Sequence, residues 1–226
     1  MTRALAASAS LVDLLGRAGT TAEVLASRHA AAYLTVGGRI VAAETSAGVG
    51  LPIAVVVDEL PPAGATVDLA TWTPGRWWDP AVPRIAPRPE RVAELRAALG
   101  RLDPPEDDAV VAARGGDPDA LVGLGSGSTP AGDDLLAGRL VALHALGDAE
   151  AAAELAAELR LDRTTPLSAE LLRRAALGEA SRPVNELLRA VERRTSVALE
   201  LEALLEVGGT SGRWLAEGIA DALDGR

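Results

Sequence analysis

Four prolines fall within the ten residues from Pro80 to Pro89, and they divide the chain into two parts of different pattern. Proline has no backbone N–H and fixes its own φ, so neither a helix nor a sheet ladder continues through such a stretch. Before it, short runs rich in Val, Ile, Tyr and Thr alternate with glycine pairs such as Gly37-Gly38, a pattern typical of strands and hairpins. After it, apolar residues recur at the three- and four-residue spacing of helices.

This change of pattern predicts an α+β protein. We expect a small β-rich N-terminal region over residues 1–87 and a mainly α-helical C-terminal bundle over residues 88–226. Within the first region, Leu11, Leu14 and Leu15 lie at helical spacing, so a leading helix is expected over residues 4–28, before the strands.

The composition limits the chemistry that this chain can perform. There is no Cys, all 22 basic residues are Arg, and His29 and His144 are the two histidines, which excludes thiolate metal sites, cysteine nucleophiles and lysine catalysis. The formal net charge of −10 opposes nucleic-acid binding. No apolar run approaches the roughly 18–20 residues of a membrane span, so we expect no membrane partner and a cytoplasmic location.

The segment GLGSGSTPAGDDLLAG, residues 123–138, predicts a turn that starts a helix. Pro130 fits the first helical position, and Thr129 fits the N-cap, where its hydroxyl can accept a backbone N–H. Glycines at every second position leave backbone N–H groups open, and a helix start adds partial positive charge. The segment therefore predicts a cradle for a small anion, with these ligand-binding residues: Gly125, Ser126, Gly127, Ser128, Thr129 and Gly132.

Asp133 and Asp134 follow within the first turn of the same predicted helix. Two carboxylates beside a bound anion repel it unless a cation lies between them, and Mg²⁺ held by one or two carboxylates is the usual mediator. We therefore expect both aspartates to be catalytic and to hold Mg²⁺. The alternative is structural: aspartates near a helix start favour the helix dipole, and Gly132 and Gly138 permit a tight turn and close packing.

A second segment, GGTSGRWLAEG at residues 208–218, repeats the order of Thr, Gly and Leu residues found in the first segment. The matching pairs are Thr129 and Thr210, Gly132 and Gly212, Leu135 and Leu215, Gly138 and Gly218. We hypothesise that both helix starts face one ligand, which adds Thr210, Ser211, Gly212 and Arg213 to the predicted ligand-binding residues. An ordinary helix stop followed by an ordinary start is the alternative. His29, at the junction before the first strand-like segment, is a further candidate, for positioning a substrate carboxylate.

These segments resemble a bacterial family long described as a domain of unknown function, which includes the AllH-like subunit of oxamate carbamoyltransferase from allantoin and purine breakdown. The family motif reads Gly-x-Gly-x-Gly-Leu-Thr-Pro-Ser-Gly-Asp-Asp. Ser128 replaces its Leu and Ala131 replaces its Ser, whereas Thr165 and Ser168 fall where the family tends to have Thr and Ser. The matching positions are Gly123, Gly125, Gly127, Thr129, Pro130, Gly132, Asp133, Asp134 and Gly138.

The resemblance implies transfer of a carbamoyl group between oxalurate or oxamate and phosphate, performed in a hetero-oligomer with other carbamoyltransferase subunits. Backbone N–H cradles and Arg donors suit such chemistry, because its charge lies on phosphate and develops on a carbonyl oxygen. Two other hypotheses stay open: the protein is a noncatalytic subunit that binds an anion or acts as a scaffold, or it is a Mg²⁺-dependent phosphotransferase. The absence of a P-loop lysine disfavours the phosphotransferase.

Overall fold

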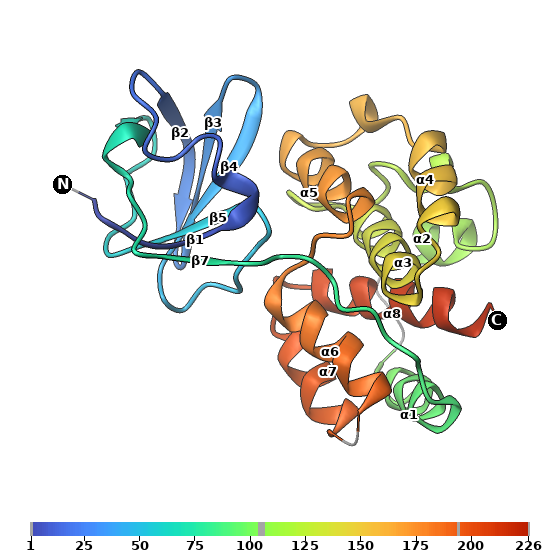
Figure 1. Cartoon of the computed structure of the whole chain (residues 1–226). Helices are drawn as coiled ribbons and strands as arrows, with labels where there is room; N and C mark the ends of the chain where they lie inside the picture. Colours follow the sequence, from blue (N-terminus) through green and yellow to red (C-terminus); the bar gives the residue numbers. More distant parts are fainter. Residues whose placement is uncertain (1, 104–106, 194, 226) are drawn as a thin grey trace. The chain divides into compact units, whose positions relative to one another are not determined.

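The computed structural model describes residues 2–103, 107–193 and 195–225. The chain forms two compact units, Met1–Pro80 and Ala81–Arg226 (Figure 1). The division therefore falls at the first of the clustered prolines, whereas the sequence placed it after residue 87. The positions of the two units relative to one another are not determined.

The N-terminal unit is a seven-stranded sheet in the order β6-β2-β3-β4-β5-β1-β7. Strands β2, β3 and β4 pair as antiparallel neighbours, whereas β5 is parallel to β4 and β7 is parallel to β1. Alternate side chains of these strands, including Leu34, Val41 and Val55, form one buried core together with Trp72. The strands are β1 Ala4–Ser8, β2 Thr21–Arg28, β3 Ala31–Val36, β4 Arg39–Glu44, β5 Ala54–Val57, β6 Thr66–Asp68 and β7 Arg76–Trp78.

The helix expected over residues 4–28 is wrong. Strand β1 and the short 3-10 helix Ala9–Leu11 begin this stretch, and β2 ends it. Strand β1 lies between β5 and β7, and this pairing on both edges outweighs the helix propensity of its alanines. The φ angles of Gly16 and Gly19, +73° and +76°, also turn the chain where a helix would continue.

The C-terminal unit is helical, so the mixed α+β architecture is confirmed. Its central helix, α3, is buried on almost every side, as expected for a helix that is apolar all round. No helix of the described ranges is long and apolar enough to cross a membrane. The helices are α1 Pro89–Leu99, α2 Asp108–Ala113, α3 Ala131–Leu146, α4 Ala149–Glu158, α5 Pro166–Ala176, α6 Arg182–Glu192, α7 Val197–Leu205 and α8 Ser211–Asp224.

Helices α3 and α8 pack backbone to backbone at two glycines. A Cβ atom on Gly138 would overlap the carbonyl oxygen of Leu215, and one on Gly218 would overlap that of Leu135. The contact is reciprocal, so the two helices use the matching positions of their repeated sequences against each other. Close helix packing is therefore one reason for the repeat.

We expect Gly138→Ala to lower the free energy of unfolding by about 1–3 kcal/mol, because the added methyl group must push two helices apart. Gly218→Ala should have a similar effect. Gly115→Ala is the matched control, since a Cβ there meets no atom within 4 Å. Urea unfolding of the three variants provides the measurement. A Gly138→Ala protein as stable as the control would contradict the close crossing.

Candidate functional site

The Gly-rich loop, residues 123–130, connects the 3-10 helix Pro118–Leu121 to α3. Gly123, Gly125 and Gly127 have φ angles of +73°, +109° and +96°, which side-chain-bearing residues rarely adopt. Residues 125–128 are exposed. No described residue accepts a hydrogen bond from the N–H groups of Gly125, Ser126 or Gly127, so these donors are open to solvent.

Helix α3 begins one residue later than the sequence predicted, with Pro130 rather than Thr129 at the N-cap. The N–H of Gly132 donates to the carbonyl of Leu124 at 2.9 Å. The N–H groups of Asp133 and Asp134 donate to the carbonyl of Pro130 at 3.0 and 3.1 Å. These three first-turn donors are therefore already used, whereas the exposed loop keeps donors for a ligand.

Asp133 holds the loop in place. The residue is 1% exposed, and its Oδ1 accepts the N–H of Gly123 at 2.8 Å. Its Oδ2 accepts the hydroxyl of Ser168 at 2.6 Å and that of Thr164. Both carboxylate oxygens are thus engaged within the chain, and they join the loop to the start of α5.

The segment before α5 supports the loop a second time. The hydroxyl of Thr165 donates to the carbonyl of Ser128 at 2.6 Å, while its Oγ1 also accepts the N–H of Ser168 and caps α5. The resemblance indicated Thr165 and Ser168, but no sequence pattern indicated Thr164. The run Thr164-Thr165-Pro166 is an ordinary helix start in sequence, and only the fold brings it against Asp133.

Asp134 has a different environment from Asp133. It is 6% exposed, and within the described part of the chain its Oδ2 has no hydrogen-bond partner. Burial raises the pKa of this carboxyl to about 7; hydrogen bonding from the Ser211 and Thr129 hydroxyls opposes the rise, and the nearby charge of Asp133 adds to it. A buried polar atom without a partner is costly, so Oδ2 is suited to meet an atom from outside the chain.

The second helix start joins this carboxyl. Helix α8 begins at Ser211, after Thr210 at the N-cap, and the Ser211 and Thr129 hydroxyl oxygens lie 2.9 Å apart. Thr129, Ser211 and Asp134 therefore form one group, which we call the hydroxyl–carboxyl cluster. The N–H of Gly212 is occupied, since it donates to the carbonyl of Val207 at 3.0 Å.

Arg213 has partners of its own outside the cluster, and His29 belongs to the other unit. The guanidinium of Arg213 donates to the carbonyl of Asp103 and lies 3.9 Å from the carboxylate of Glu217. His29 lies in the N-terminal unit, at the turn between β2 and β3, with a φ of +42°.

Magnesium at this site stays a prediction. The described residues contain no group of three or more His, Asp and Glu side chains that could hold a metal ion. Asp133 is poorly suited as a ligand because both of its oxygens already accept hydrogen bonds. Asp134, with its unpartnered oxygen, is the carboxylate that could contribute to a site completed by oxygens of a ligand.

The two aspartates should respond differently to the same substitution. Asp133→Asn places an amide where two hydroxyls and one N–H donate, so we expect a loss of about 1–3 kcal/mol in the free energy of unfolding at pH 7. Asp134→Asn removes no comparable set of contacts and should leave stability at pH 7 unchanged or raised. Chemical denaturation of both variants measures this, and equal losses would contradict the division of roles.

The raised pKa of Asp134 also predicts a pH dependence of stability. A carboxyl with a higher pKa in the folded than in the unfolded state stabilises the fold when protonated. Its contribution is therefore complete below the unfolded pKa near 4 and is lost as the pH rises to about 7, by at most about 1.4 kcal/mol per pH unit. Relative to the wild type, Asp134→Asn should gain stability between pH 5 and pH 8. If the free energies of unfolding of the wild type and Asp134→Asn change in parallel over this range, the raised pKa of Asp134 is refuted.

Comparison with known proteins connects this arrangement to a family. Residues 121–223 match the family model described as "Oxamate carbamoyltransferase subunit AllH", a span that includes the Gly-rich loop and the starts of α3, α5 and α8. No curated protein and no solved structure matches the chain. Over this part of its helical unit, the chain is therefore similar to the family of the AllH subunit of oxamate carbamoyltransferase.

Proposed function

We propose that the chain is a carbamoyltransferase subunit that binds a small phosphorylated or carboxylated ligand between the Gly-rich loop and the hydroxyl–carboxyl cluster. The observation that carries the proposal is the unpartnered Oδ2 of Asp134, buried beside two hydroxyls and next to a loop with open N–H donors. The family match over residues 121–223 supports the choice of carbamoyl transfer.

The available groups suit both ends of such a ligand. Oxamate and carbamoyl phosphate each combine an anionic group with an amide NH₂. The N–H groups of residues 125–127 can donate to the anionic oxygens, and a carboxylate oxygen such as Asp134 Oδ2 can accept the amide N–H. Carbamoyl transfer develops negative charge on a carbonyl oxygen, for which the N–H groups of the loop are the candidate donors.

Magnesium remains part of the proposal for a phosphorylated ligand. Asp134 would hold the ion together with phosphate oxygens, and the ion would supply the positive charge that separates carboxylate from phosphate. Asp133 keeps a positioning role in this proposal, because its contacts fix the loop and the start of α5.

A thermal-unfolding panel tests the ligand site. Phosphate, carbamoyl phosphate, oxamate, oxalurate and ATP are each added with and without Mg²⁺, since selective binding to the folded state raises the melting temperature. We expect a rise with carbamoyl phosphate or oxamate that disappears in Asp134→Asn and persists in the exposed control Asp162→Asn. A rise that survives in Asp134→Asn would contradict the site, and a rise with ATP only would favour a phosphotransferase.

Activity measurements test the hypothesis that this chain acts as one subunit of a carbamoyltransferase. Carbamoyl transfer from carbamoyl phosphate to oxamate, which forms oxalurate and releases phosphate, is assayed with this chain by itself and after addition of the other carbamoyltransferase subunits. We expect turnover only in the mixture, with at least a tenfold loss for Asp134→Asn. A mixture in which Asp134→Asn is fully active would instead indicate a scaffolding role for this chain.

A further inference from the structure

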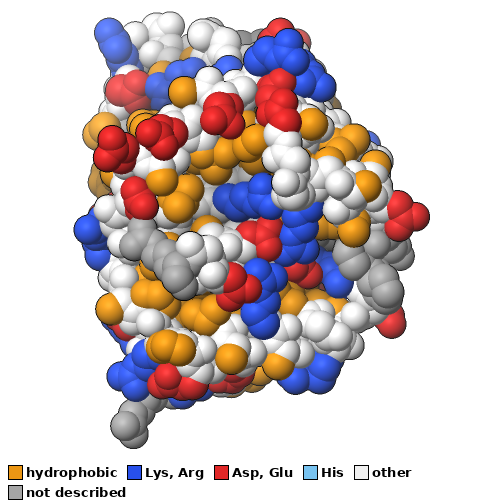
Figure 2. All heavy atoms as spheres, turned by 90° about the vertical axis from the view of Figure 1, so that its right-hand side faces the viewer, with side chains coloured by type: hydrophobic (Ala, Val, Ile, Leu, Met, Phe, Trp, Pro, Cys, Tyr) orange, Lys and Arg blue, Asp and Glu red, His pale blue; other side chains and the backbone are white. Residues whose placement is uncertain are grey.

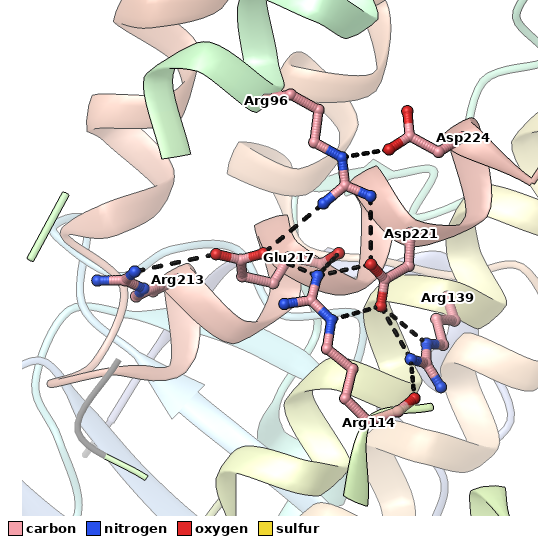
Figure 3. A network of polar contacts seen from close by, with 7 residues as sticks. All are labelled: Arg96, Arg114, Arg139, Arg213, Glu217, Asp221 and Asp224. Carbon is pink, nitrogen blue, oxygen red and sulfur yellow. Dashed lines mark hydrogen bonds and ion pairs between the residues drawn. The ribbon is translucent and has the colours of Figure 1, made fainter. Parts of the chain in front are cut away.

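A polar pocket of about 340 Å³ lies between α1 and α8 of the helical unit. Figure 2 shows basic and acidic side chains gathered at the centre of one face, with apolar side chains around them. Figure 3 shows a network of hydrogen bonds and ion pairs between arginines and carboxylates, whose residues come from α1, α3 and α8 and from the end of α2. The pocket is lined by Arg96, Leu99, Gly100, Leu102, Arg213 and Glu217.

Two arginines of the network serve packing. Arg114 makes two hydrogen bonds to Asp221, at 2.5 and 2.8 Å, and a third to Glu217 at 2.8 Å. Arg139 donates to Asp221 and to the carbonyl of Arg114, at 2.8 and 2.7 Å. These contacts fasten α3 and the end of α2 to α8, so they leave little for a ligand.

The two arginines that line the pocket retain unused donors. Arg96 donates to Asp224 and Asp221 through Nε and Nη2, but its Nη1 lies 3.9 Å from Glu217, beyond hydrogen-bond distance. Arg213 Nη2 is also 3.9 Å from Glu217, on its other carboxylate oxygen, and the buried Nε of Arg213 has no partner among the described residues. Guanidinium donors thus lie on both sides of Glu217 without an acceptor at bonding distance.

The charges of the network favour an added anion. The four arginines drawn in Figure 3 face three carboxylates, Glu217, Asp221 and Asp224, which leaves one positive charge in excess. The whole chain carries a formal net charge of −10, so this excess is a local feature. Leu99 and Leu102 add apolar lining, which suits the carbon part of a small organic anion.

We propose that this arginine pocket binds a small carboxylate- or phosphate-bearing anion, whose oxygens accept hydrogen bonds from Arg96 and Arg213. The site is separate from the hydroxyl–carboxyl cluster: Ser211 and Arg213 are two residues apart on α8, and their side chains have different partners. Guanidinium groups recognise both oxyanion types by the same planar, charge-assisted hydrogen bonds, so the chemistry is shared between carboxylate and phosphate.

Isothermal titration of the full chain with acetate and with inorganic phosphate, at constant ionic strength, tests the pocket and separates the two oxyanion types. We expect binding of at least one of them, weakened at least tenfold in Arg213→Gln. The matched control is Arg160→Gln, which removes one exposed arginine that pairs with Asp119 elsewhere in the unit. Failure of both anions to bind, or equal losses in both variants, would overturn the proposal.

A substitution that is expected to strengthen anion binding keeps the proposal testable if Arg213→Gln fails to fold. Glu217→Gln removes the negative charge from the pocket but keeps a side-chain oxygen for Arg114, so we expect at least threefold tighter anion binding, which a misfolded protein would not show. Unchanged or weaker binding would overturn the proposal.

Asp134→Asn separates the two proposed sites. Anion binding in the arginine pocket should survive this substitution, because Asp134 does not line the pocket. Binding that is lost in Asp134→Asn but kept in Arg213→Gln would place the anion at the hydroxyl–carboxyl cluster and reject the arginine pocket.

Discussion

The close crossing of α3 and α8 is the contact on which both candidate sites depend. At Gly138 and Gly218 the two backbones touch, with no room for a side chain. This distance brings the starts of the two helices together, so that Thr129 and Ser211 share a hydrogen bond. The same crossing sets Arg139 of α3 against Asp221 of α8. Glycine is required here because only a missing Cβ allows helices to pack this tightly.

Asp133 and Asp134 show how adjacent, identical side chains acquire different roles. Successive helix positions point about 100° apart, so the two carboxyls meet different neighbours. Asp133 accepts three hydrogen bonds and fixes the loop, whereas Asp134 is desolvated and keeps an unpartnered oxygen. A fully satisfied carboxylate stabilises a fold, and an unsatisfied one is available for a ligand.

Sequence patterns predicted the main architecture but failed near the N-terminus. The proline cluster and the change of apolar spacing separated the strands from the helices, because both signals are local. The alanines of β1 carry no strand signal of their own, and pairing with β5 and β7 decides their conformation. The same limit applies to Thr164, whose contact with Asp133 joins residues 31 positions apart in the chain.

The sequence by itself determined the class of the fold, the Gly-rich turn before α3 and the repeat that ends in α8. Glycine, proline and helical periodicity act within a few residues, so they can be read without a structure. Tertiary structure decided which donors and carboxyls remain free. In the folded chain the N–H of Gly132 and the carboxylate of Asp133 have hydrogen-bond partners, whereas Asp134 Oδ2 has none. Arg213 lines a separate pocket. The physical reason is that burial and hydrogen bonding depend on neighbours from distant parts of the chain, which no local pattern specifies.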